Sequence, residues 1–320
     1  MSEIKKEFPK VKKEMHVRNQ HRERYNFKLL TANYEALGSF VKPNSYGDLS
    51  IDFADPKAVL ALNTAILKTH YKLDFWEIPK DFLCPPIPSR ADYIHYIADL
   101  LAETHKGEVP TGKKITCLDV GIGASCIYPI VGNYEYSWSF IGSDISTASL
   151  KSAKQIATNN KKLNAAVKTR LQQNSRFVFE GIINSHELID VSICNPPFHS
   201  SFHEARKANA RKVKNLQKKG SAQPLLNFGG QQNELWCEGG EFKFINDMIF
   251  ESRRFSKQCL WFTTLVSKKE SLKPLYKTLK KVEALEVKTI EMSQGNKISR
   301  VLCWTFLNPI QQSKWATDNW

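Results

Sequence analysis

The sequence contains no apolar run long enough to cross a membrane. A spanning helix needs about 20 consecutive apolar residues, and charged or polar residues interrupt every apolar stretch of this 320-residue chain well before that length. The amino terminus is basic but no apolar segment follows it, which argues against a signal peptide. We therefore expect a soluble, cytoplasmic protein that makes no use of a membrane.

Cysteine pairs at metal-binding spacing are also absent. The seven cysteines are scattered, and no two of them are separated by only two residues. Cysteine-based zinc sites usually contain such pairs, so the sequence predicts no metal site. Most of the cysteines stand among apolar residues, as in the segment 115–120, and we interpret them as small buried side chains in a reducing compartment.

Acidic residues are fewer than basic ones. The chain has 46 Lys and Arg against 32 Asp and Glu, a formal net charge of +14. Basic residues concentrate in four stretches, 1–30, 151–170, 203–220 and 268–281. This distribution predicts a polyanionic partner, and nucleic acid fits better than an anionic membrane because none of these stretches carries a strong apolar face.

Helical and extended segments alternate over most of the chain. Helices are predicted at 91–105, 149–164, 241–255 and 272–282, and strands at 115–121, 137–144, 176–181, 188–198, 259–267, 286–293 and 299–308. This alternation predicts a mostly parallel sheet with helices on both faces. The last two strands are joined by only a few residues, so they must pair antiparallel. We therefore predict an α/β fold of the Rossmann-like, class I methyltransferase type, with seven strands and an antiparallel last strand.

The first 85 residues follow a different pattern. A polar, basic segment is followed by a helical pattern at 27–41, a short strand at 49–53 and a helix at 55–71. Three prolines within 84–90 predict that this segment is not helical. We therefore divide the chain into a basic N-terminal extension, 1–85, and a catalytic domain, 86–320, with a basic insertion at about 199–240.

The first candidate site follows the strand 115–121. Gly121 and Gly123 allow the backbone to turn tightly and to approach a ligand. The third glycine of a dinucleotide-binding fingerprint is missing, which argues against NAD. Asp144 ends the next strand, where a carboxylate can hold the hydroxyl groups of a ribose. Together, Asp119, the glycine loop and Asp144 favour S-adenosylmethionine as the cofactor.

The second candidate site is the sequence Asn195-Pro196-Pro197-Phe198, at the carboxyl end of a predicted strand. The Asn195 carbonyl and the Pro196 backbone carbonyl can accept both protons of an exocyclic amino group. Two prolines stiffen the loop, and Phe198 offers a face for stacking of a planar group. Such a sequence can also be a plain loop, but its place after the glycine loop and the ribose-type acid favours methyl transfer to a planar nitrogen.

These motifs together resemble a known enzyme family, the ribosomal large-subunit adenine-N6 methyltransferases of the RlmF type. The eukaryotic relatives of that family methylate adenines in a small nuclear RNA and in hairpins of messenger RNA. The resemblance covers residues 15–307. It is carried by the segments MHVRN at 15–19, PPIPSRADYIHYIADLL at 85–101, DVGIGASCIYPIVG at 119–132, NPPF at 195–198 and EMSQGNKISRVLCWTF at 291–306.

The resemblance implies a role for individual residues. Arg90 would reach the carboxylate of S-adenosylmethionine, and Ser175 would lie near its adenine. The cofactor loop would be lined by Asp119, Gly121, Gly123 and Ser125. Asp144 would hold the ribose, and residues 195–198 would bind the target adenine after it has flipped out of the RNA.

The resemblance also implies contacts with RNA. The basic insertion would clamp the phosphates that flank the flipped base, and the basic amino terminus would bind RNA farther away. The residues expected to do this are Lys12, Lys13, Arg18, Arg22, Arg206, Lys207, Arg211, Lys212, Lys214, Lys218 and Lys219.

The sequence thus predicts S-adenosylmethionine-dependent, metal-independent methylation of the N6 amino group of one adenine in 23S ribosomal RNA, by a monomer acting on the RNA or on a pre-ribosomal particle. Three alternatives stay open. A guanine-N2 methyltransferase of ribosomal RNA would more typically have a glycine where Ser200 stands, and a protein-glutamine methyltransferase would leave the basic stretches without a purpose. A catalytically inactive RNA-binding assembly factor would not need Asp119, Asp144 and Asn195.

Overall fold

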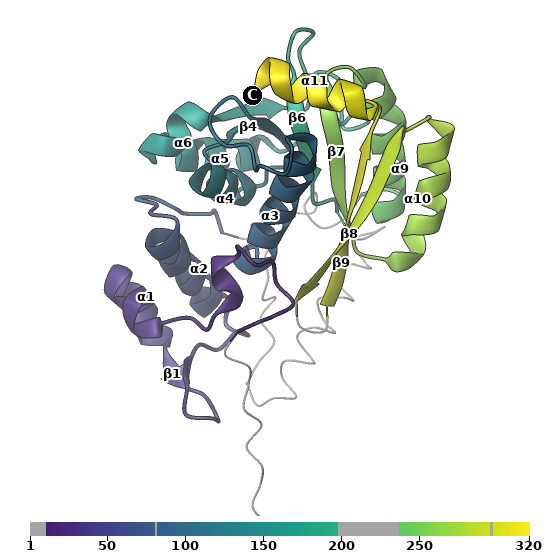
Figure 1. Cartoon of the computed structure of the whole chain (residues 1–320). Helices are drawn as coiled ribbons and strands as arrows, with labels where there is room; N and C mark the ends of the chain where they lie inside the picture. The colour runs from purple at the N-terminus through teal and green to yellow at the C-terminus, as the bar shows by residue number, and fades with distance from the viewer. Residues whose placement is uncertain (1–10, 81, 198–236, 295–296) are drawn as a thin grey trace, which may run out of the picture.

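The structure is a computed structural model that describes residues 11–80, 82–197, 237–294 and 297–320. At its centre lies a seven-stranded sheet with the strand order β5-β4-β3-β6-β7-β9-β8 (Figure 1). Strands β3 to β7 run parallel, and β9 lies antiparallel between β7 and β8. The predicted Rossmann-like architecture and its antiparallel last strand are therefore confirmed. The strands are β3 (Thr116–Val120), β4 (Ser139–Asp144), β5 (Val167–Leu171), β6 (Ile189–Cys194), β7 (Cys259–Val266), β8 (Glu286–Gln294) and β9 (Lys297–Thr305).

Helices cover both faces of this sheet, because successive strand residues alternate between two hydrophobic cores. Cys117 of β3 points to the core formed with α3, α4 and α5, whereas Leu118 points to the core formed with α9 and α10. Figure 1 shows α9 and α10 together on one side of the sheet. The covering helices are α3 (Ile87–Thr104), α4 (Ile127–Tyr136), α5 (Thr147–Thr158), α6 (Lys161–Ala166), α9 (Gly240–Ser252), the short η3 (Arg253–Phe255), α10 (Lys269–Lys281) and α11 (Pro309–Asn319).

The segment before α3 packs on the same side as α3 and α4. Its buried residues Leu37, Ile66 and Trp76 belong to the same hydrophobic cluster as those helices. The predicted start of α2 is confirmed, since the side chain of Asp55 accepts a hydrogen bond from the Lys57 backbone and Pro56 is the first helical residue. The division of the chain at residue 85 stays a prediction. The elements here are η1 (Gln20–Arg22), α1 (Phe27–Asn33), η2 (Glu35–Phe40), β1 (Lys42–Pro43), β2 (Leu49–Ser50) and α2 (Pro56–His70).

The predicted strand at 176–181 is wrong. The third parallel strand is instead β5, at 167–171, and 176–181 is irregular. Burial of Val178 and Phe179 explains the apolar pattern that suggested a strand. The backbone N–H groups of Val178, Phe179 and Glu180 all donate to the carboxylate of Glu251 on α9. A buried side chain therefore satisfies donors that a strand would have paired with a neighbouring strand.

Helix boundaries also differ from the prediction at several places. Residues 87–90, predicted to be non-helical, form the first turn of α3, since a proline in the first turn removes no helical hydrogen bond. The predicted helix at 149–164 is divided into α5 and α6. Helix α4 was not predicted because it contains Pro129 and Gly132; a Cβ on Gly132 would lie 2.4 Å from the Phe140 ring, so close packing requires this glycine.

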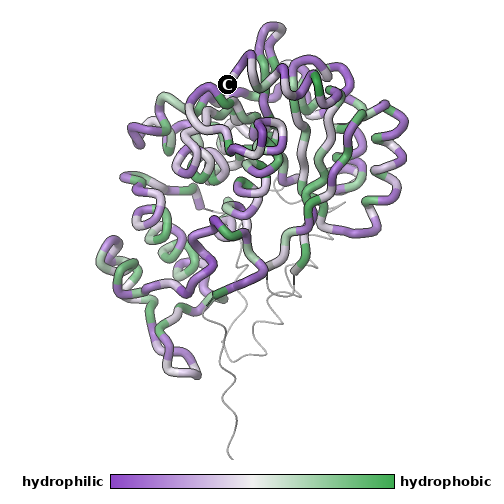
Figure 2. The backbone as a smooth tube through the Cα atoms, in the orientation of Figure 1, coloured by the Kyte–Doolittle hydropathy of each residue, from purple (hydrophilic) through white to green (hydrophobic). Residues whose placement is uncertain are grey.

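The C-terminal helix α11 was also missed, although its start carries a clear signal. Asn308 and Gln311 form a reciprocal capping box, and Pro309 is the first residue of the helix. Figure 2 shows that hydrophobic residues concentrate along the central strands. None of the helices in the described part of the chain is long and apolar enough to cross a membrane.

Candidate active site

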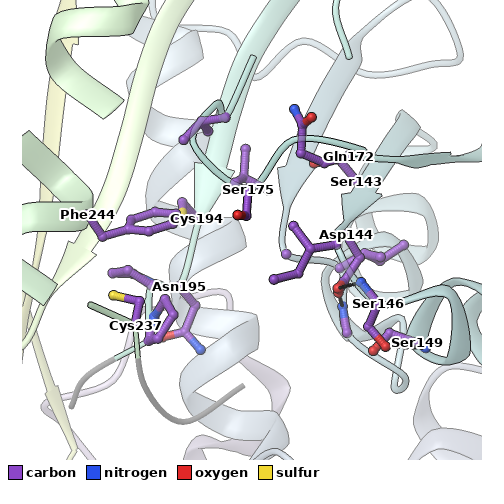
Figure 3. Close-up of a pocket in the computed structure, with 18 of the residues that line it drawn as sticks. Ser143, Asp144, Ser146, Ser149, Gln172, Ser175, Cys194, Asn195, Cys237 and Phe244 are labelled. Carbon is purple, nitrogen blue, oxygen red and sulfur yellow. Dashed lines mark hydrogen bonds between the residues drawn. The ribbon is translucent and has the colours of Figure 1, made fainter. Parts of the chain in front are cut away.

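A cavity of about 770 Å³ opens at the carboxyl ends of the parallel strands. The last residues of β3, β4 and β6, namely Val120, Asp144 and Cys194, all line it. Doubly wound sheets bind ligands at this edge, and the volume suits a nucleotide-sized molecule. In Figure 3, Asp144, Ser146 and Ser149 lie on one side of this cavity, and Asn195, Cys194 and Phe244 lie on the other.

The glycine loop after β3 presents its backbone to the cavity. Gly121 and Gly123 have φ angles of 75° and 63°, which residues with a side chain rarely adopt. The Gly121 N–H donates to the Ser143 carbonyl at 2.9 Å, and the Gly123 N–H donates to Asp144 Oδ2 at 3.0 Å. These two bonds attach the loop to the end of β4, as expected for a loop that a ligand approaches closely.

The carboxylate of Asp144 is held in place by backbone donors. Oδ2 accepts from Gly123, and Oδ1 accepts from the Ser146 N–H at 2.8 Å. Burial raises the pKa of this carboxyl, and the bonds from Ser146 and Gly123 partly oppose that rise. Because a carboxylate oxygen can accept more than one hydrogen bond, Asp144 retains capacity for hydroxyl groups of a ligand in the cavity.

Asp119, which directly precedes the lining residue Val120 in β3, is completely buried. Neither of its carboxylate oxygens has a hydrogen-bond partner among the described residues. Burial, and then the charge of Asp144, raise the pKa of this carboxyl well above its usual range. A buried carboxylate without donors is costly, so Asp119 requires either a proton or a cationic ligand beside it.

Asn195 follows β6 and lines the cavity opposite Asp144 (Figure 3). Its side-chain oxygen Oδ1 is buried and accepts no hydrogen bond from any described residue. Pro196 and Pro197 line the same wall. The amide oxygen thus has acceptor capacity that no described residue uses. Phe198, the last residue of the predicted motif, lies outside the described residues.

A buried tyrosine, not identified from the sequence, supports the Asn195 segment from the core side. Tyr93 of α3 accepts a hydrogen bond from the backbone N–H of Cys194 at 3.3 Å and contacts Thr263 Oγ1 at 2.7 Å. The Thr263 hydroxyl donates to the Ser192 carbonyl at 2.7 Å, so the proton between Tyr93 and Thr263 comes from Tyr93. The chain of bonds joins α3 and β7 to the end of β6.

The remaining predicted cofactor residues, Arg90, Ser125 and Ser175, also line the cavity. Arg90 donates to the hydroxyl of Ser89 at 3.1 Å. The structure therefore brings together every predicted cofactor residue except Asp119, which lies just behind the lining. Several lining residues were not predicted because no local motif marks them: Gln172, Arg176, Cys237, Glu238, Lys243, Phe244 and Asp247.

The predicted RNA-binding residues near the amino terminus differ in exposure. Lys13 is exposed, whereas Lys12 is half-buried and donates to the His21 carbonyl at 3.2 Å. Arg18 donates to Asp99 at 2.6 Å and to the Tyr136 hydroxyl at 2.9 Å, and Arg22 donates to the Val17 carbonyl. Arg18 therefore joins the MHVRN segment to α3 and α4, and contact of these four residues with RNA stays a prediction.

The other predicted RNA-binding residues, Arg206 to Lys219, lie outside the described residues.

All seven cysteines have free thiols, and five of them are buried, as predicted for small apolar side chains. In the described ranges, no three His, Cys, Asp or Glu side chains gather into a set that could hold a metal ion.

The sheet topology, the glycine loop and the two facing walls of the cavity define a class I methyltransferase. A sequence model described as RNA methyltransferase matches residues 9–308, nearly the whole chain. The ribosomal RNA large subunit methyltransferase F of Shewanella halifaxensis is 54% identical, over 95% of this chain and 85% of the relative. The protein of the same name from Serratia proteamaculans is 52% identical, over 99% and 95%. The chain belongs to this RNA methyltransferase family and is an enzyme.

Solved structures of human METTL16 have the same fold. The catalytic domain in complex with the MAT2A 3′UTR hairpin 1 has a TM-score of 0.77 and 29% identity, over 92% of this chain and 96% of that one. The N-terminal domain in complex with SAH has a TM-score of 0.72 and 26% identity, over 92% and 99%.

The cofactor of this enzyme is S-adenosylmethionine, of which SAH is the demethylated form. The residues present fit this molecule. The unpartnered carboxylate of Asp119 matches a cationic ammonium group, the spare acceptors of Asp144 match ribose hydroxyls, and the backbone at Gly121 and Gly123 is open to the cavity.

Proposed function

We propose that this enzyme methylates the N6 amino group of one adenine in the ribosomal RNA of the large subunit. The observation that carries the proposal is the amide oxygen of Asn195, which is buried and unpartnered within the described residues, on a residue that lines a cofactor-sized cavity. The names of the bacterial relatives, identical at about half of their positions, support ribosomal RNA as the substrate.

On the cofactor side of the cavity, the proposed roles follow the chemistry of each group. Arg90 binds the carboxylate of the cofactor, Asp119 faces its ammonium group, and Asp144 accepts hydrogen bonds from its ribose hydroxyls. The backbone of the glycine loop with Ser125 lines one side of the cofactor, and Ser175 lies beside its adenine. When bound, S-adenosylmethionine supplies a methyl group on a positively charged sulfur, which makes that carbon electrophilic.

On the other side, the enzyme must prepare a poor nucleophile. The lone pair of an exocyclic amino nitrogen is delocalised into the adenine ring. We propose that Asn195 Oδ1 and the Pro196 carbonyl accept hydrogen bonds from the two amino N–H groups, which draws the nitrogen toward tetrahedral geometry and directs its lone pair at the methyl group. After the transfer, the methylated nitrogen releases one of these protons to solvent. Pro197 limits the freedom of the loop, and Phe198 stacks on the flipped base.

Two basic regions are proposed to hold the rest of the RNA. The N-terminal extension, 1–85, binds RNA away from the target base, and the insertion at about 199–240 binds phosphates beside it. Neutralising Lys212, Lys214, Lys218 and Lys219 together is expected to weaken RNA binding and to flatten its salt dependence. An unchanged slope would contradict a role of the insertion in binding phosphates.

The decisive experiment supplies labelled S-adenosylmethionine and ribosomal RNA from cells that lack this protein, followed by nucleoside analysis. Label in N6-methyladenosine is the expected result, and label in N2-methylguanosine would overturn the proposal. The same assay with isolated pre-ribosomal particles identifies which form of the RNA is the better substrate. We also propose that the enzyme acts as a monomer, which light scattering under assay conditions tests directly.

A further inference from the structure

Helix α10 presents a strongly basic face to solvent. Five of its thirteen residues are exposed lysines, against one glutamate, Glu270. Figure 2 shows this helix as largely hydrophilic along its length. The five exposed lysines are Lys269, Lys273, Lys277, Lys280 and Lys281.

The orientation of this face is fixed by the opposite side of the helix. Leu272, Leu275 and Leu279 are almost completely buried against the sheet and α9. This apolar stripe is therefore used inside the protein and is not available to a lipid surface, which a membrane-binding amphipathic helix would require. The lysines are held outward by the packing of the leucines.

The charges on this face are not neutralised by neighbours. In the part of the chain that the structure describes, none of the five lysines forms an ion pair. Elsewhere on the surface such pairs do form, for example Lys243 with Asp247 at 2.7 Å and Lys314 with Asp318 at 3.0 Å. Unpaired like charges on one helix repel each other, so binding of a polyanion to this face relieves the repulsion and lowers the free energy.

The face also begins at the active site. Helix α10 starts three residues after β7 ends at Val266, and Val266 and Ser267 line a smaller cavity of about 150 Å³ that shares Arg90 and Asn195 with the main one. From there the helix extends for about 18 Å at 1.5 Å per residue. A nucleic-acid strand bound along this face can therefore continue into the cavity.

Exposed aromatic rings lie on the neighbouring helix α9. Phe242 and Phe250 are each 41% exposed, and the ammonium group of Lys281 lies 5.3 Å from the centre of the Phe250 ring. A lysine beside an exposed aromatic ring is typical of surfaces that bind single-stranded nucleic acid, because the phosphate contacts the lysine while a base stacks on the ring.

We propose that the exposed lysines of α10 form a third RNA-binding surface, which holds the phosphates of the RNA segment flanking the target nucleotide. This inference rests on the proposed function only in that it takes RNA as the substrate. Each lysine that contacts a phosphate releases bound counterions, so the surface contributes to the salt dependence of RNA binding.

The test replaces Lys269, Lys273 and Lys277 together by glutamine, which keeps helix propensity and removes three charges. The matched control replaces Lys106, Lys113 and Lys257 by glutamine; these exposed lysines form no ion pair among the described residues and lie between α3 and β3 or just before β7, at the amino ends of the strands. RNA binding is measured against salt concentration with in-vitro transcribed large-subunit ribosomal RNA, and thermal unfolding verifies that both variants fold.

The α10 variant is expected to bind RNA about tenfold more weakly, with a slope of log K against log salt reduced by about 2 to 3. The control is expected to bind as the wild type does. Equal slopes for the two variants would overturn the inference, as would a larger loss of binding to vesicles of anionic lipid than to RNA.

Failure of this inference is distinguishable from failure of the proposed function. If the wild type methylates adenine while the α10 variant binds RNA normally, the α10 surface is refuted and the activity stands. If the wild type transfers no methyl group to ribosomal RNA while the α10 variant still shows the reduced salt slope, the activity is refuted and the surface stands.

Discussion

The two walls of the cavity are held in place in different ways. On the cofactor wall, both oxygens of Asp144 accept bonds from backbone N–H groups of their own neighbourhood, Gly123 and Ser146. On the substrate wall, the side-chain oxygen of Asn195 accepts no hydrogen bond from the described residues. The backbone beside it is instead held from the core side by Tyr93 and Thr263. The cofactor wall is thus formed before any ligand binds, whereas the substrate wall leaves one acceptor free for the incoming base.

The largest effect is expected for Asn195→Ala, which removes the free acceptor of the substrate wall. By comparison with the loss of one preorganised hydrogen-bonding group in other active sites, kcat should fall by about 10²–10³-fold. Calorimetric binding of S-adenosylmethionine and filter binding of RNA should both stay at wild-type levels. Full activity would show that the two walls do not divide the work in this way, and a wild type without activity would indicate an assembly factor.

A smaller effect, on cofactor binding and not on RNA binding, is expected for Asp144→Asn on the cofactor wall. Gly123 and Ser146 donate to different oxygens of Asp144, so in the amide one of these backbone N–H groups would face the NH2 group instead of an acceptor. Loss of charged hydrogen bonds of this kind should weaken cofactor binding by about 10–100-fold. RNA affinity should be unchanged. Weakened RNA binding without weakened cofactor binding would reverse the assignment of the two walls.

The support beneath the substrate wall is tested by Tyr93→Phe. Without the hydroxyl, the Cys194 N–H and Thr263 lose a partner in the core, which should cost about 1–3 kcal/mol of unfolding free energy and lower kcat more than it changes the affinity for the cofactor. Denaturant unfolding and steady-state kinetics measure both effects.

A matched control for this change exists in the same protein. Tyr276 contacts Thr289 at the same 2.7 Å, but on the exposed surface. Tyr276→Phe should therefore change neither stability nor kcat measurably, because water replaces the lost bond. Equal losses for the two variants would mean that Tyr93 acts only through general stability.

Most of the site could be predicted from the sequence because its residues follow strand ends. Asp144 and Asn195 each stand at the end of a strand that the apolar pattern reveals, and parallel strands bring their carboxyl ends to one edge. Tyr93 could not be identified in this way, since its role depends on a hydroxyl that meets Thr263, 170 residues later in the chain. Phe244 likewise lies in an ordinary amphipathic helix.

The same contrast explains the errors in the fold. Residues 176–181 have the apolar content of a strand, but Glu251, more than seventy residues away, accepts their backbone N–H groups. Strand β5 itself is short and only its first residue, Val167, is buried, so its apolar pattern is weak. Local patterns predict segments whose hydrogen bonds are regular, and they fail where a distant side chain replaces those bonds.

The smallest predicted effect concerns Asp119, which stands behind the cofactor wall and lacks the donors that fix Asp144. Because burial raises its pKa in the folded protein, the folded state holds this proton more tightly than the unfolded state does. The contribution of Asp119 to stability is therefore present at low pH and is lost as the pH rises toward the raised pKa.

In the cofactor-free enzyme, Asp119→Asn should remove this loss and raise Tm by about 2–4 °C at alkaline relative to acidic pH. Saturating S-adenosylmethionine should stabilise the wild type more than the variant, because only a carboxylate is paired by the ammonium group. Thermal unfolding between pH 5 and pH 8, with and without the cofactor, measures both differences; an equal shift of the two proteins by the cofactor would show that Asp119 does not face that charge.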